Sequence, residues 1–148
     1  MRQLFEIVVF GDGFVDGLDF VEFSSGSQPL TKAQYEQKLG PLLNDVVDPA
    51  LRDVLSNSGA RSPRKLGAAI TILRLSHDQM AAVTAPAAVA DLHTQTVAVL
   101  ASMISEMTKL RDAEARSDTR AAPAAEAALK TDAQHLETLG SQFTSRGY

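Results

Sequence analysis

Three histidines are the side chains of this sequence best suited to hold a ligand or a metal ion. His77, His93 and His135 all fall on segments with a helical pattern, and imidazoles that converge inside a helical bundle can bind a metal. Asp132 and His135 form one Asp-x-x-His pair, but a dinuclear bundle needs a second such pair and two more glutamates, which the chain lacks. Histidines at the edge of a core, each bonded to a carbonyl or a nearby acid, are the simpler interpretation. We therefore predict no metal and no cofactor, and keep the three histidines as candidate ligand-binding residues.

A second candidate site is a group of basic residues where a helix should begin. Arg61, Arg64 and Lys65 lie within five positions of one another. Free N–H groups at a helix N-terminus together with cations could bind a phosphate, a carboxylate or a lipid head group. Cations at this end oppose the helix dipole, however. The alternative is a solvated loop whose charges pair with Asp53 or with the end of a neighbouring helix.

The composition excludes several classes of function. The chain has no Cys, so disulfides, thiolate metal sites and Cys nucleophiles are absent. No Ser or Thr lies in a Gly-x-Ser-x-Gly context and no nucleophile–base–orienter set is visible, so we predict no catalytic residues and no enzyme. The pI of about 5.3 argues against nucleic-acid binding. No apolar run approaches the ~20 residues of a membrane span, so we predict no transmembrane segment.

The periodicity from residue 31 onward predicts an all-α, antiparallel four-helix bundle, because short loops join successive helical segments. Thr31 and Gln34 have the spacing of a capping box. The first helix should run over 31–56 and be kinked or segmented at Gly40-Pro41 and Asp48-Pro49, since proline lacks an N–H. Residues 56–59 (Ser-Asn-Ser-Gly) should end it.

Three further helices complete the predicted bundle. The second helix should start at Ser62-Pro63. The third should start at Ala85-Pro86, with Thr84 as its cap, and end near Ala115. A loop over 118–123 should precede the fourth helix, which stops near Gly140 or at the tail. The face of the second helix should contain Leu66, Ile70, Leu73, His77 and Met80. Met80, Met103 and Met107 could line a pocket, but core filling is their usual role.

The first 28 residues differ from the rest of the chain. They contain five of the six Phe and carry a net charge of −4, whereas the other 120 residues are neutral overall. The turn sequence Gly11-Asp12-Gly13 between apolar runs favours a β-hairpin or an extended segment. This segment has no usable signal-peptide pattern as written. We therefore divide the chain into an acidic, Phe-rich segment with its linker (1–28) and a helical domain (29–148).

Two motifs resemble those of actinobacterial surface lipoproteins of uncharacterised function. The first is Ser24-Ser25-Gly26-Ser27 followed by Leu30-Thr31-Lys32-Ala33-Gln34-Tyr35, and the second is the stretch 85–93 with Val97, Leu100 and Leu110 after it. The resemblance implies an all-α extracytoplasmic domain without known catalytic residues. Such proteins carry a lipid-attached Cys where this chain has Phe23, so lipid anchoring of that kind is not available here. A cytoplasmic location therefore stays open.

The function expected from these observations is a non-enzymatic interaction or accessory domain of the cell envelope, with an unknown protein partner. The alternative is a bundle that binds a small ligand or a metal through His77, His93 and His135.

Overall fold

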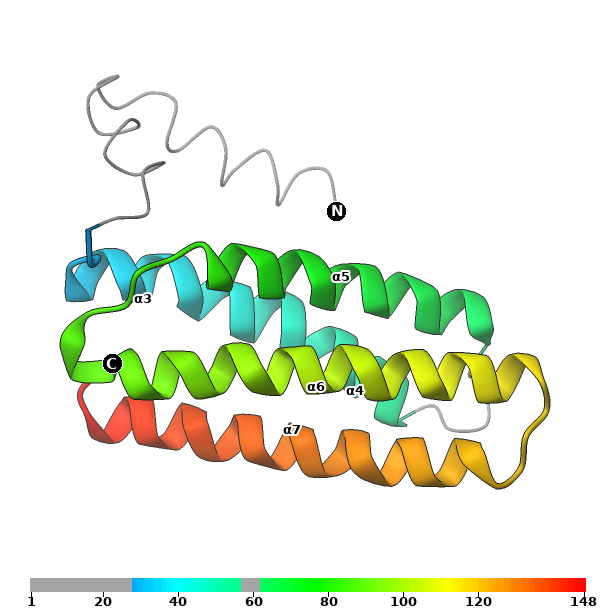
Figure 1. Ribbon diagram of the computed structural model, residues 1–148. Helices are drawn as coiled ribbons and strands as arrows, with labels where there is room; N and C mark the ends of the chain where they lie inside the picture. The colour runs from blue at the N-terminus through cyan, green and yellow to red at the C-terminus, as the bar shows by residue number, and fades with distance from the viewer. Residues whose placement is uncertain (1–27, 57–61) are drawn as a thin grey trace, which may run out of the picture.

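The computed structural model describes residues 28–56 and 62–148, and this part of the chain is 84% helical with no strand. The all-α prediction is therefore confirmed for these residues, and successive long helices run in opposite directions (Figure 1). The expected N-terminal hairpin lies outside the described residues. The helices are α3 (Lys32–Pro41), π-helix η1 (Leu42–Val47), α4 (Asp48–Ser56), α5 (Pro63–Ala81), 3-10 helix η2 (Ala87–Val89), α6 (Ala90–Ala115) and α7 (Ala121–Ser145).

The first long helix is segmented, as predicted. At its start the Thr31 side chain accepts a hydrogen bond from the Gln34 N–H, and the Gln34 side chain accepts one from the Thr31 N–H, which completes the capping box. Pro41 ends α3 and cannot donate to the helical ladder, and η1 follows it directly. Pro49 lies in the first turn of α4. The prolines therefore flank a six-residue π-helix, a widened form of helix that occurs often at functional sites.

The starts of the other helices follow local rules, with two differences from the sequence prediction. The last helix begins at Ala121, inside the loop that was expected over 118–123. Ser62 caps α5 by accepting a hydrogen bond from the Lys65 N–H, and Pro63 is the first helical residue, as predicted. The third helix instead begins at Ala90, because Pro86 is extended and η2 intervenes before α6. At the last helix Asp118 accepts hydrogen bonds from the N–H groups of Arg120 and Ala121.

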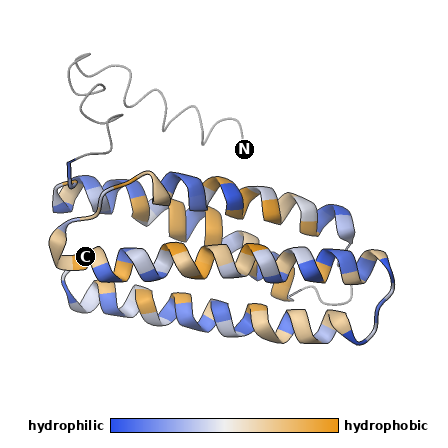
Figure 2. Ribbon diagram, in the orientation of Figure 1, coloured by the Kyte–Doolittle hydropathy of each residue, from blue (hydrophilic) through white to orange (hydrophobic). Residues whose placement is uncertain are grey.

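The core forms around α6, which packs extensively against both α5 and α7 (Figures 1 and 2). Its fully buried residues include Leu100, Met103, Met107 and Leu110. The three methionines suggested above as pocket residues are entirely buried, so they fill the core. The stretch Ala87–Ala115 is also long and apolar enough to cross a membrane. A buried core helix passes the same test, so this is weak evidence for a span.

The predicted face of α5 is wrong at one position. Leu73, Ser76 and Met80 are buried, whereas the side chain of His77 is 28% exposed. Neighbouring residues point about 100° apart around a helix axis, so Ser76 and His77 cannot both lie at the centre of one face. In α5 it is Ser76 that lies in the buried stripe.

Candidate functional site

An apolar groove runs between the first helical segment and the last helix. It has a volume of about 220 Å³. Its walls come from η1 and α4 on one side and from α7 on the other, with Thr96 of α6 as part of its lining. The lining residues are Leu43, Asn44, Asp48, Leu51, Arg52, Leu55, Thr96, Ala133, Leu136, Glu137, Leu139, Gly140 and Phe143.

The groove exists because one seam of the bundle is not fully packed. Helix α6 packs along both of its neighbours, whereas α4 and α7 touch at only a few points. Leu43, Leu55, Leu136 and Phe143 are consequently only half-buried, although each packs against the core. Further apolar surface at this seam can still be removed from water, which would favour association with an apolar partner.

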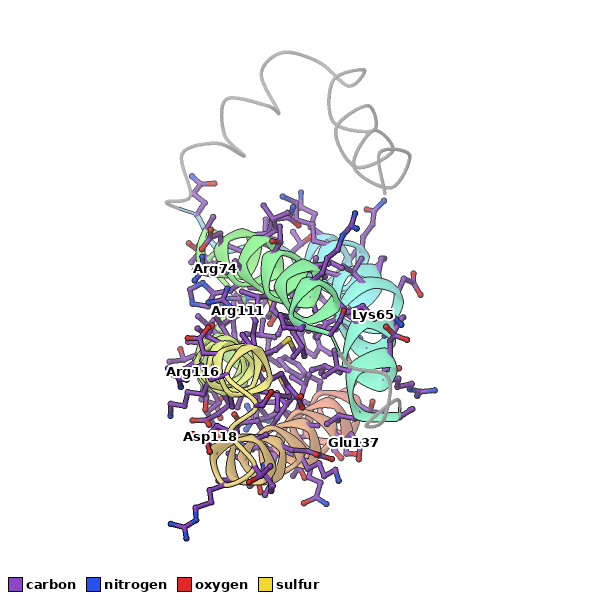
Figure 3. All side chains as sticks on the ribbon, turned by 90° about the vertical axis from the view of Figure 1, so that its right-hand side faces the viewer. Lys65, Arg74, Arg111, Arg116, Asp118 and Glu137 are labelled. Atoms are coloured by element: carbon purple, nitrogen blue, oxygen red, sulfur yellow. The ribbon has the colours of Figure 1, made fainter. Side chains whose placement is uncertain are left out.

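The rim of the groove carries charge. Arg52 forms an ion pair with Asp48, with 2.9 Å between Nε and Oδ2. Glu137 lies on the side of α7 that faces α4 (Figure 3), and its carboxylate has no ion-pair or hydrogen-bond partner within residues 28–56 and 62–148. The Asp48–Arg52 pair is neutral as a unit, so Glu137 leaves one uncompensated negative charge at the rim.

Gly140 marks an open position in the α7 wall. A Cβ atom added there would meet no heavy atom within 4 Å. The sequence suggested Gly140 as a helix end, but α7 continues through it to Ser145. A Cβ at this position, in the wall of the groove, would therefore displace none of its neighbours.

Tyr35 and His93 form a buried polar contact between the start of α3 and α6. The Tyr35 hydroxyl lies 3.0 Å from His93 Nδ1, and the ring centroids are 5.7 Å apart in an edge-on arrangement. Burial lowers the pKa of the His93 imidazole, and hydrogen bonding to the backbone of Met80 and Val83 opposes this shift. Because backbone carbonyls only accept, we assign the proton of the neutral ring to Nε2, so that Nδ1 accepts from Tyr35. Burial likewise raises the pKa of Tyr35, which keeps its hydroxyl protonated.

The C-terminal residues tie α7 to the same end of the molecule. Arg146 makes two hydrogen bonds to the Asp91 carboxylate, at 2.6 and 2.8 Å, and a third to the Ala88 carbonyl. The side-chain bonds from Arg146 lower the pKa of Asp91. Tyr148 meets the Tyr35 ring edge-on, with centroids 5.9 Å apart. Hydrogen bonds and ring contacts therefore hold α7 to α3 and α6 at this end of the bundle, whereas α7 and α4 make few contacts along the groove.

The structure does not gather the three histidines into a site. His77 bonds to the adjacent Asp78, His93 to Tyr35, and His135 is exposed on α7. None of them lines the groove. Among the residues that the structure describes, no group of three or more His, Asp or Glu side chains could hold a metal ion. His93 therefore matches the simpler interpretation of a satisfied core histidine.

The basic residues at the start of α5 are exposed where the structure describes them. Arg64 and Lys65 both face solvent, and Arg61 lies outside the described residues. The Lys65 N–H is bonded to the Ser62 side chain, and Pro63 has no N–H. Two of the first amides of this helix are thus unable to bind an anion, and only the solvated arrangement has support from these contacts.

Sequence reasoning missed the groove. The two proline breaks in the first helix were predicted, but no signal in the sequence indicated that the seam between the first and last helices stays open. The fold and groove define the described chain as an all-α bundle with an apolar groove along the seam between α4 and α7. Comparison of the sequence and structure with protein-family models, curated proteins and solved structures finds no match.

Proposed function

We propose that this protein is a non-catalytic interaction domain that binds its partner in the groove between α4 and α7. The observation that carries the proposal is the row of half-buried apolar side chains along an open seam, next to a bundle whose other helices are well packed. Apolar surface of this kind marks binding grooves more often than isolated exposed side chains do. The resemblance of the sequence to envelope lipoproteins supports a role at the cell envelope as part of this proposal.

The contacts of the polar residues support binding rather than catalysis. The buried histidine has both ring nitrogens engaged, by Tyr35 on one side and by the backbone of Met80 and Val83 on the other. The groove lining contains a single hydroxyl, that of Thr96, and it donates to the Leu92 carbonyl at 2.8 Å. Neither group is arranged as a nucleophile next to a base.

Site-specific photo-crosslinking in the cells that make the protein tests this proposal. A photoreactive amino acid replaces Asn44 at the groove rim, and a matched one replaces the exposed Ala68 on α5. We expect a discrete adduct from position 44 that is absent from position 68 and that fractionates with the envelope. Gly140→Leu adds a bulky side chain to the groove wall and should abolish the adduct. Equal labelling from both positions, or no adduct from position 44, contradicts the proposal.

A further inference from the structure

The size of the groove indicates what kind of group it accepts. Pockets for drug-sized ligands measure about 300–1,000 Å³, and an apolar cavity of about 150 Å³ holds a benzene molecule. At about 220 Å³ the groove lies between the two. It therefore suits a few apolar side chains presented by a larger molecule better than an entire small ligand.

The shape of the groove favours a helix as the carrier of those side chains. The α7 wall extends from Ala133 to Phe143, and ten residues of helix correspond to about 15 Å. A helix of about ten residues spans this length and presents apolar side chains at positions i, i+3 or i+4, and i+7. Strand addition needs a sheet edge, and residues 28–56 and 62–148 contain no strand. Proline-rich ligands use grooves lined by several aromatic rings, whereas Phe143 is the single aromatic residue of this lining.

The charge of the rim restricts the partner further. Within residues 28–56 and 62–148, the Glu137 carboxylate has no ion-pair partner, and it lines the same groove as the neutral Asp48–Arg52 pair. A basic side chain on the docking helix would satisfy it, and an acidic one would be repelled. The acidic segment 1–28, with its net charge of −4, is therefore disfavoured as the occupant.

We propose that the groove binds an amphipathic helix of a partner protein, with its apolar stripe against Leu55, Leu136 and Phe143 and a Lys or Arg beside Glu137. This inference rests on the proposed function and adds the chemistry of the partner to it. The bound helix would pack along the α4–α7 seam as a fifth helix of the bundle. It would cover the half-buried leucines and bring a cation to the unpaired acid.

Two fluorescein-labelled synthetic peptides test the proposal with the full-length protein. Both are amphipathic helices of about twelve residues with Leu at i, i+3 and i+7, and they differ only in having Lys or Glu beside the apolar stripe. We expect saturable fluorescence anisotropy for the Lys peptide and binding about tenfold weaker for the Glu peptide. Glu137→Lys should reverse this order. The control Glu114→Lys makes the same charge change on α6 outside the groove lining and should preserve it.

A second pair of variants tests the location of binding without threatening the fold. Gly140→Leu adds a bulky side chain to the groove wall, and Gly67→Leu makes the same change on α5, outside the groove lining. A Cβ atom meets nothing within 4 Å at either site. Leu is a better helix former than Gly, so both variants should fold. Only Gly140→Leu should abolish Lys-peptide binding.

Each other outcome overturns the inference. Binding of neither peptide, equal binding of both, or binding unchanged by Gly140→Leu contradicts the partner helix. Peptide binding that requires deletion of residues 1–27 identifies that segment as the occupant. Self-association that Leu75→Ser removes identifies a second copy, because Leu75 is an exposed leucine on α5. The photoreactive residue at position 44 separates the two proposals. If it still yields an adduct in cells that Gly140→Leu abolishes, the proposed function stands and only the chemistry assigned to the partner is wrong.

Discussion

Acidification should destabilise the bundle through His93, the buried histidine bonded to Tyr35. Because burial lowers the pKa of His93 in the folded state, the unfolded chain binds more protons than the folded one as the pH falls. The free energy of unfolding therefore rises with pH. The contribution of the neutral His93 to it is fully present above the unfolded histidine pKa of about 6.5, and it is lost as the pH falls below that value. The slope for one proton is at most about 1.4 kcal/mol per pH unit. If His93 stays neutral in the fold, moving from about pH 7.5 to about pH 5 costs up to about 2 kcal/mol.

Urea unfolding at several pH values measures this effect directly. His93→Gln removes the titrating ring, so the free energy of unfolding should lose this part of its pH dependence even if the variant is less stable throughout. The control His135→Gln changes an exposed histidine on α7 and leaves the buried contact in place. The reasoning is refuted if His93→Gln and wild type have the same slope between about pH 5 and about pH 7, or if acid stabilises the wild type.

Three further changes test separate parts of the structure. Tyr35→Phe keeps the ring but leaves His93 Nδ1 without its donor, so urea unfolding should show a loss of about 1–3 kcal/mol; no loss would contradict the buried hydrogen bond. Gly140→Ala adds a Cβ in open space within α7, so unfolding should show a gain of about 0.5–1 kcal/mol, and a loss would mean that the site is crowded. Deleting residues 1–27 should shift Tm by only a few degrees in calorimetry, and a large drop would mean that this segment packs on the bundle.

The helix starts were predictable because their causes are local. Thr31 with Gln34, and Ser62 with Pro63, lie within three residues of each other, and each pair forms the expected cap. The two proline breaks were equally visible. Helix faces were less certain where neighbouring residues have similar character, and His77 was placed on a face that Ser76 occupies.

The polar and open features depend on contacts between distant segments. Tyr35 and His93 are 58 residues apart, and neither carries a local signal that identifies the other. The groove depends on how closely α4 approaches α7, which the apolar pattern of either helix does not determine. A half-buried leucine and a fully buried one look identical in a sequence. The fold class was therefore predictable from residue patterns, whereas the candidate site required the packed structure.

Phe143 links the groove to the buried polar contact, and this constrains how the two can be tested. Its side chain lines the groove, and its ring centroid lies 6.0 Å from that of Tyr35. A substitution of Phe143 would therefore alter the groove wall and the surroundings of the Tyr35–His93 pair together, so a loss of binding could not be separated from a loss of stability. Gly140 and Glu137 line the groove but form no hydrogen bond or ion pair with Tyr35 or His93 within the described chain. Changes at these two positions isolate binding, and changes at His93 isolate the acid response.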